Sequence, residues 1–294
     1  MVNVTSNRLE TTNLDIHYLR AGRGSPLVLL HGWPEFSGIW HKNIPTLAET
    51  FDVIAPDLRK FGKTRLLDPD DTTTTNPDIL AEDLLHLADR LGLQHLGIIC
   101  HDVGAYAAHA FARRWPDRVA GLLFFDCPYP GIGRRWAEPE HLREIWYQSF
   151  HQQPWAAELV GYNRDTCRIY FKNFLSHWAH DPHAFDADLD LWVDNFMTPG
   201  NIQGGFDWYV GFHDARIRQL NQAPLDLPPL AMPTRVLWGA SDPVLKAEWS
   251  DHLHDYFRQA EVTIVPEAGH FVPYEQPDYA NAEMLSFFKR VFAL

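Results

Sequence analysis

Six short apolar runs recur along the 294-residue chain, and each one ends in polar or turn-forming residues. Continuous apolar runs of this length are typical of strands that are buried on both faces of a sheet. Helix-like segments separate the runs, and strands that alternate with helices favour a mostly parallel sheet. The expected strands lie within residues 26–34, 51–59, 96–102, 119–128, 234–243 and 261–270.

Start and stop signals delimit the helices that we expect to flank this sheet. Residues 76–92 begin with Asn-Pro, carry acidic residues early and end at a glycine, as a capped helix does. Residues 104–116 stop at a proline, and residues 277–292 close the chain. Residues 7–22 have the pattern of an antiparallel hairpin at the sheet edge, which brings the expected number of strands to eight. Residues 59–63 are expected to form a surface loop.

Residues 131–222 interrupt the alternation, because they contain no strong strand-like run and many aromatic residues. We expect an inserted helical cap there, which separates the two parts of a core formed by residues 1–130 and 223–294. The Pro-rich residues 221–233 lead back to the core. Open α/β sheets bind ligands at the carboxyl ends of their strands, so a cap would cover that crevice.

Composition limits the classes of partner. The net charge of −13 argues against nucleic acid, whose phosphates need a basic surface. No stretch approaches the roughly 20 uninterrupted apolar residues of a membrane helix. Three irregularly spaced cysteines and a polar start without signal-peptide features predict reduced thiols and a cytoplasmic location. The 11 Trp and 18 Phe are suited to a pocket for a small apolar or aromatic substrate. We also consider a homodimer, although no feature of the sequence indicates the oligomeric state.

The sequence predicts neither a cofactor nor a metal. No glycine-rich phosphate-binding pattern lies at a strand–helix junction. His177, His180, Asp181 and His183 offer metal-binding atoms, but their spacing is loose and Pro182 interrupts any single helical face.

Asp102 stands where the third apolar run ends and a helix-like segment begins, in the sequence "IICHDVGA". A carboxylate in that position can simply cap the helix, because helix N-termini favour negative charge. However, the pattern small-x-Asp-x-small, with Cys100 and Gly104 as the small residues, resembles the nucleophile elbow of the α/β-hydrolase fold. Cys100 departs from the glycine that is usual at the first small position.

The other parts of such a site follow in the order that this fold requires. His31-Gly32-Trp33-Pro34 resembles the His-Gly-x-Pro motif of the oxyanion hole, and an ordinary Gly-Pro turn is the alternative that we favour less. The resemblance implies that the backbone N–H groups of Trp33 and Val103 stabilise negative charge. It also implies that His270, which follows the last apolar run, is the catalytic histidine.

Two acids compete for the third position of the triad. Asp242 ends the penultimate run, and Asp126 ends the run that follows the elbow helix. Either carboxylate could orient His270 through its second ring nitrogen. We favour Asp242 and keep Asp126 as the alternative.

With an aspartate in the elbow, the sequence resembles one branch of the α/β-hydrolases. This branch consists of the epoxide hydrolases and the haloalkane and haloacetate dehalogenases. A carboxylate suits attack on a saturated carbon, which gives an alkyl ester. Water activated by His270 would then hydrolyse this ester.

Two segments of the expected cap resemble the lid of epoxide hydrolases. They are "WYQSFHQQP" (146–154) and "GGFDWYVG" (204–211), and the resemblance makes Tyr147 and Tyr209 the donors that protonate the epoxide oxygen. The alternative is that both tyrosines only pack within the lid. The remaining residues that we expect around the substrate are His31, Trp146, Phe150, Trp208 and Phe271.

Our first interpretation is therefore an epoxide hydrolase, and two alternatives stay open. A dehalogenase fits less well, because Val103 stands where haloalkane dehalogenases usually carry Trp, and Trp33 stands where many carry Asn. The arginines of haloacetate dehalogenases correspond here to Val103 and Tyr106, yet Asp126 is where those enzymes place their acid. A binding protein that keeps the fold without turnover is the third possibility.

Overall fold

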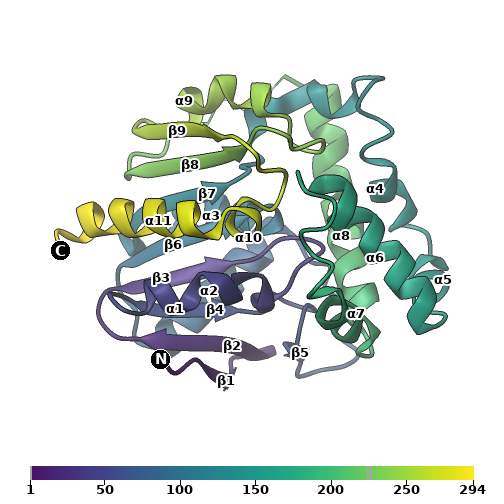
Figure 1. Cartoon of the computed structure of the whole chain (residues 1–294), viewed down its shortest axis with the longest axis horizontal. Coiled ribbons are helices and arrows are strands. Elements are labelled where there is room, and N and C mark those ends of the chain that lie inside the picture. Colours follow the sequence, from purple (N-terminus) through teal and green to yellow (C-terminus); the bar gives the residue numbers. More distant parts are fainter. Residues whose placement is uncertain (1, 224, 226) are drawn as a thin grey trace.

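Eight strands form one continuous path across a single sheet in the computed structural model, which describes residues 2–223, 225 and 227–294 (Figure 1). Their order across the sheet is β1-β2-β4-β3-β6-β7-β8-β9, and the two-residue β5 (Arg65–Leu66) pairs with β2 beside this path. The strands are β1 (Thr5–Glu10), β2 (Leu14–Gly22), β3 (Pro26–Leu30), β4 (Asp52–Pro56), β6 (Leu96–His101), β7 (Val119–Phe125), β8 (Thr234–Gly239) and β9 (Ala260–Val265).

The predicted sheet topology is confirmed. β1 and β2 form the antiparallel hairpin at the edge, and β2 also runs antiparallel to β4. Every neighbouring pair from β4 to β9 is parallel. The carboxyl ends of these parallel strands therefore meet along one edge of the sheet, and residues that follow different strands come together there.

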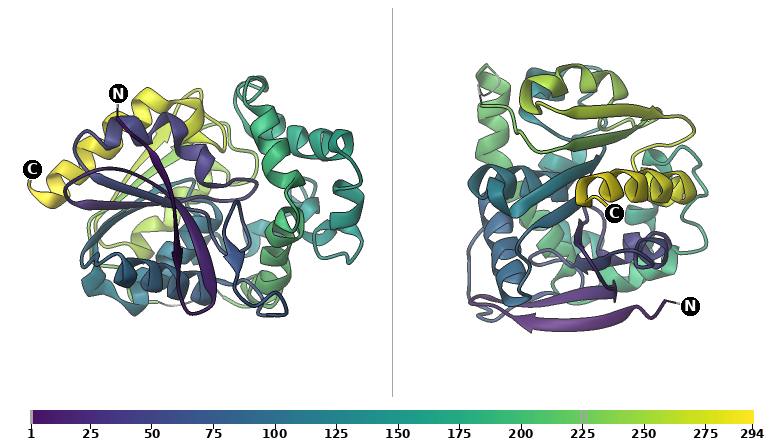
Figure 2. Two further views of the ribbon diagram at one scale, coloured as in Figure 1. Left: turned by 90° about the horizontal axis from the view of Figure 1, so that it is seen from below. Right: turned by 90° about the vertical axis from the view of Figure 1, so that its left-hand side faces the viewer.

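Helices cover both faces of the sheet, as Figure 2 shows from below. α2 (Pro77–Arg90) and α3 (Val103–Arg114) pack on one face, and α1 (Ile44–Leu47) and α11 (Pro277–Phe292) pack on the other. α2 starts as its sequence predicts, because the Asn76 side chain accepts a hydrogen bond from the Ile79 N–H and caps the helix. The shorter core helices are η1 (Ser37–Lys42), η2 (Pro116–Arg118), η4 (Ala247–His252), α9 (Leu253–Tyr256) and α10 (Val272–Glu275).

Residues 130–221 contain helices and loops but no strand, and we call them the helical layer. The layer lies beside one edge of the sheet and stands apart from the two helical faces (Figures 1 and 2). It touches the core loops that follow the strands: the Trp192 indole N–H donates to the Pro34 carbonyl, and the His270 N–H donates to the Trp178 carbonyl. Its helices are η3 (Pro130–Ala137), α4 (Trp146–Phe150), α5 (Ala156–Val160), α6 (Arg164–Trp178), α7 (Leu189–Met197) and α8 (Asn201–Asn221).

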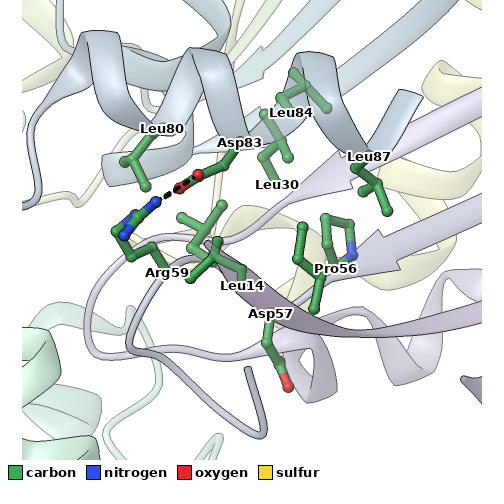
Figure 3. Close-up of a pocket in the computed structure, with 11 residues that line it drawn as sticks. Leu14, Leu30, Pro56, Asp57, Arg59, Leu80, Asp83, Leu84 and Leu87 are labelled. Carbon is green, nitrogen blue, oxygen red and sulfur yellow. Dashed lines mark hydrogen bonds and ion pairs between the residues drawn. The ribbon is translucent and has the colours of Figure 1, made fainter. Parts of the chain in front are cut away.

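Residues 59–63 form the predicted loop after β4, but the expectation that this loop lies at the surface is wrong for most of it. Arg59 and Phe61 are only 3% and 1% exposed. The guanidinium of Arg59 donates two hydrogen bonds of 2.8 Å to the Asp83 carboxylate of α2 (Figure 3). This paired geometry satisfies both charges in a buried place, and it ties the loop after β4 to the helix.

Two further sequence predictions can be compared with the structure. Among the described residues, no helix has both the length and the apolar character needed to cross a membrane. The three cysteines are free and buried. In the Pro-rich return to the core, positions 224 and 226 lie outside the described residues.

Candidate active site

Asp102 occupies a sharp turn between β6 and α3. Its φ of 45° and ψ of −112° lie outside the regions that non-glycine residues favour, and such strain persists where the surroundings enforce it. The carboxylate makes no capping hydrogen bond to α3, which argues against the interpretation of Asp102 as a helix cap. The following glycine is required, because a Cβ on Gly104 would lie 2.5 Å from the Leu30 carbonyl oxygen. Cys100 fits beneath the turn with its thiol 3.6 Å from the Leu123 carbonyl oxygen.

The loop after β3 brings a backbone donor to this carboxylate. The Trp33 N–H donates a hydrogen bond of 2.9 Å to Asp102 Oδ1. A Cβ on Gly32 would approach the Asp102 Cβ to 2.5 Å, so only glycine allows the two loops to come this close. Val103 is the first residue of α3, where N–H groups have no acceptor within the helix. The loop after β3 is therefore more than a simple Gly-Pro turn, because its Trp33 N–H orients one oxygen of the Asp102 carboxylate.

His270 stands on the other side of the carboxylate. Its Nδ1 lies 2.7 Å from Asp242 Oδ2, and its Nε2 lies 3.9 Å from Asp102 Oδ2. The ring is fully buried, and Nε2 has no hydrogen-bond partner. Burial alone would lower the pKa of His270, but the charge and hydrogen bond of Asp242, together with the charge of Asp102, raise it to about 9.

Asp242 and Asp126 have different roles in the geometry. Asp242 holds His270 with one oxygen and accepts hydrogen bonds from the Val244 and Leu245 N–H groups with the other. Asp126 is fully buried, accepts the Gly239 N–H with Oδ1 and has no partner for Oδ2. Burial, and next the charge of Asp242, raise the pKa of Asp126 well above its usual value, which favours a neutral carboxyl group.

The two predicted tyrosines meet above the elbow, from α4 and α8. Tyr147 is 3% exposed and Tyr209 is 8% exposed, with their ring centroids 5.4 Å apart. The Trp33 indole lies against both rings: it stacks on Tyr147 at 5.2 Å and meets Tyr209 edge-on at 5.7 Å. Burial raises the pKa of each phenol, and the negative charge of Asp102 raises both further. Both tyrosines therefore carry their protons at neutral pH.

Comparison with known proteins shows to which family this chain belongs. Residues 25–277 match the family described as the alpha/beta hydrolase fold. The chain belongs to the α/β-hydrolase family. A soluble epoxide hydrolase from Corynebacterium sp. (strain C12) is 32% identical over 97% of both chains. Epoxide hydrolase 4 of Homo sapiens is 29% identical over 96% of this chain and 78% of its own length.

Solved structures agree with this family. The structure titled "Epoxide hydrolase CorEH without ligand" has a TM-score of 0.85 and 29% identity, and covers 98% of this chain and 100% of its own. Cfl2 from Burkholderia cenocepacia has a TM-score of 0.83 and 27% identity, and covers 96% of this chain and 95% of its own. These relatives identify this α/β-hydrolase as an enzyme of the hydrolase class.

Three of the residues expected around the substrate are buried near the elbow of this α/β-hydrolase. Phe271 is fully buried with its ring 5.2 Å from that of His270. Trp208 is 3% exposed and packs against Tyr106, one helical turn after Asp102. His31 is also fully buried, but both of its ring nitrogens bond to main-chain atoms of Gly32 and Leu58. The His31 side chain thus ties the loop after β3 to the loop after β4, and its contact with substrate stays a prediction.

The other two expected pocket residues lie farther out. Trp146 of α4 is 46% exposed, so its expected contact with the substrate stays a prediction. Its indole packs on Phe174 and Phe150 and leaves one face in solvent. Phe150 is half-buried between His151 and Trp155. The aromatic spacing in this segment could not distinguish inward from outward side chains.

A buried ion pair beneath the elbow was not predicted from the sequence. His101 Nδ1 lies 2.8 Å from Glu35 Oε1, both side chains are fully buried, and the His101 ring centroid is 4.5 Å from that of His270. Burial would raise the pKa of Glu35, but the charge of His101 holds it below its usual value. Glu35 directly follows one recognised motif and His101 lies within the other, yet nothing in either motif indicates that the two side chains meet.

Glu275 on α10 is a second unpredicted residue, and it fixes the loop that carries His270. Its carboxylate accepts hydrogen bonds of 3.0 Å from the Gly269 and Phe271 N–H groups, which flank His270. It also accepts one of 2.6 Å from the His180 N–H of the helical layer. The histidine loop and the layer are therefore held by one side chain.

The histidines of residues 177–183 do not converge on a metal position. His177 pairs with Glu144, His180 with Ser241 and His183 with Asp186. In the part of the chain that the structure describes, the donor atoms of His101, Asp126 and His270 do lie within 4.8 Å of one another. This group consists of His270 and two of its buried neighbours, and we assign no metal to it.

Proposed function

We propose that this α/β-hydrolase opens an epoxide to a vicinal diol through a covalent ester on Asp102. The observation that carries the proposal is that the two carboxylate oxygens of Asp102 have different surroundings. Oδ1 is held by the Trp33 N–H, while Oδ2 faces the unpartnered Nε2 of His270 beneath two buried phenols. The names of the relatives support the same activity.

In the first step, Oδ2 of Asp102 attacks one epoxide carbon and the carbon–oxygen bond of the ring breaks. The oxygen that leaves is a strong base, so it needs a proton at once. Tyr147 and Tyr209 come from different helices of the layer and stand over the elbow, where one phenol can donate its proton and the other a hydrogen bond. We therefore propose that residues 131–222 act as a cap and that the substrate binds between them and the core.

In the second step, His270 Nε2 removes a proton from water, and the water oxygen attacks the carbonyl carbon of the ester. Negative charge develops on Oδ1, which the N–H groups of Trp33 and Val103 stabilise. The bond between the carbonyl carbon and the diol oxygen then breaks, and His270 returns its proton to that oxygen. The proton of the new Asp102 carboxyl group passes to the tyrosinate left by the first step, which restores all three groups. Ester formation also removes the charge of Asp102, which is one cause of the raised pKa of His270. Alkylation therefore shifts His270 toward the neutral form that can act as a base.

A carbon–halogen hydrolase is the second candidate, and one observation favours it. The indole Nε1 of Trp33 is buried with no hydrogen-bond partner, and an N–H donor of this kind suits a departing halide. A halide leaves as a stable anion and needs no proton, so the two phenols would be superfluous for that reaction.

A parallel screen of epoxides and of haloalkanes with haloacetates tests the proposal. We expect diol formation that Asp102→Asn abolishes, with slower or no halide release. Halide release without diol from any epoxide would transfer the assignment to the second candidate. Failure of both reactions in folded protein would favour a binding protein without turnover.

A further inference from the structure

Arg216 lies on α8, on the helix face that also carries Tyr209 and Phe212. These residues are spaced by three and four positions, so they stand above one another along the helix. Tyr209 and Phe212 are buried against the core, and Arg216 is half-buried next to them. Seven residues of helix place Arg216 roughly 10 Å along the axis from Tyr209.

The guanidinium of Arg216 has aromatic neighbours and no acidic partner. Its Cζ lies 3.9 Å from the centre of the Trp136 ring and 5.3 Å from that of Phe212. Its Nη1 donates a hydrogen bond of 3.1 Å to the Gln219 side chain, the Tyr106 phenol also lies within its hydrogen-bonding reach, and its Nε is buried without a partner. Within the described residues it forms no ion pair. The aromatic rings offset part of the cost of removing this charge from water, but a buried donor remains unused.

Two further polar groups adjoin the guanidinium. Tyr106 packs on Phe212 at 4.7 Å and lies one turn after Asp102 on α3; burial raises the pKa of its phenol and the charge of Arg216 opposes that rise. His141 is fully buried, has no partner for either ring nitrogen and meets the same Trp136 ring at 5.9 Å. Both residues can donate a hydrogen bond, and neither brings a negative charge.

We propose that Arg216 binds the carboxylate of an epoxide substrate, with Tyr106 and His141 as additional donors. The inference rests on the proposed function and names its substrate class: epoxides that carry a carboxylate at the end remote from the ring. The rings of Trp208 and Phe212 stack on each other and pack on Tyr106, one turn after Asp102, and such rings suit an apolar linker between the two polar ends. The Arg216 guanidinium of α8 thus stands next to the Tyr106 side chain of α3.

The test compares ω-epoxy carboxylic acids of increasing chain length with their methyl esters. The quantity measured is the ratio of kcat/KM for acid and ester, in wild type, Arg216→Gln, Arg216→Lys and Arg218→Gln. Arg218 is exposed on the same helix and serves as the matched control. A hydrogen-bonded charge pair contributes about 1.5–3 kcal/mol, so Arg216→Gln should lower the ratio by about 10- to 100-fold. Arg216→Lys should restore part of it, and Arg218→Gln should leave it unchanged.

A binding measurement separates this inference from the proposed reaction. Calorimetric titration with 5-phenylpentanoate and 5-phenylpentanamide needs no turnover, so it remains decisive if no epoxide is hydrolysed. We expect wild type to prefer the carboxylate and folded Arg216→Gln to lose that preference. Equal binding of the acid and the amide by wild type would overturn the inference, as would an acid-to-ester ratio that Arg216→Gln does not change.

Discussion

Replacing Asp242 with asparagine should slow hydrolysis of the ester far more than its formation. Asp242 holds His270 Nδ1 at 2.7 Å and is the main charge that raises the pKa of the buried imidazole. The difference between the ordinary pKa of 6.5 and the value of about 9 corresponds to roughly 3 kcal/mol in favour of the imidazolium. Removing the charge leaves burial as the dominant effect, so the pKa of His270 should fall well below 9.

The rate effect of Asp242→Asn follows from the second role of the acid. In the hydrolytic step His270 becomes an imidazolium, which the carboxylate stabilises and an amide does not. Loss of such an orienting acid can cost up to about 10⁴ in rate. Attack by Asp102 requires no base, so ester formation should persist and the ester should accumulate in single-turnover quench experiments.

Asp126→Asn provides the matched control. The environment of Asp126 already favours the neutral carboxyl group, so an amide of similar shape changes little charge. We expect Asp126→Asn to retain most of the hydrolytic rate and the raised pKa of His270, followed by NMR of ¹⁵N-labelled histidine. A larger loss from Asp126→Asn than from Asp242→Asn would refute this division of roles.

Further variants and conditions give separate outcomes. Asp102→Asn and Asp102→Ala should each abolish turnover while the melting temperature shows a folded protein; activity in folded Asp102→Ala would remove Asp102 as the nucleophile. Tyr147→Phe and Tyr209→Phe should each slow epoxide opening by about 10²–10⁴-fold, in line with general-acid catalysis, and should affect halide release less. The rate of ester hydrolysis should rise with pH, because the neutral imidazole is the base, and should level off above the apparent pKa of His270. This pKa should lie below about 9, because ester formation removes the charge of Asp102. A rate that falls over this range would contradict the role of His270. Glu275→Ala leaves three N–H groups without their acceptor, so it should lower the free energy of unfolding by about 1–3 kcal/mol and slow hydrolysis of the ester. Thermal melts measure the first effect, and single-turnover rates measure the second.

The sheet could be predicted from the sequence because its central strands are apolar throughout and end at clear turn signals. β5 could not, because two residues at the edge of the sheet carry no periodic pattern. The loop at Arg59 was misjudged because charged residues usually indicate exposure, and only the fold brings Asp83 of α2 to the guanidinium.

The candidate site was predictable where a motif carries its own local geometry, as at Asp102 and Trp33. The sequence favoured Asp242 over Asp126 as the partner of His270 but left both open, since both follow neighbouring strands and the directions of their side chains are known only from the structure. The contact between Glu35 and His101 joins residues far apart in the sequence, and it depends on how the loop after β3 lies against β6. Sequence order alone contains no such information.

The most direct test of the account is the mass of the protein after reaction with an epoxide. In His270→Gln, Asp102 should still attack while no group activates water, so intact-protein mass spectrometry should show one added substrate mass. The adduct should be absent from the double variant Asp102→Asn/His270→Gln, and peptide mapping should locate it on Asp102. Absence of an adduct with every epoxide that the wild type converts, or its presence in the double variant, would contradict covalent catalysis by Asp102.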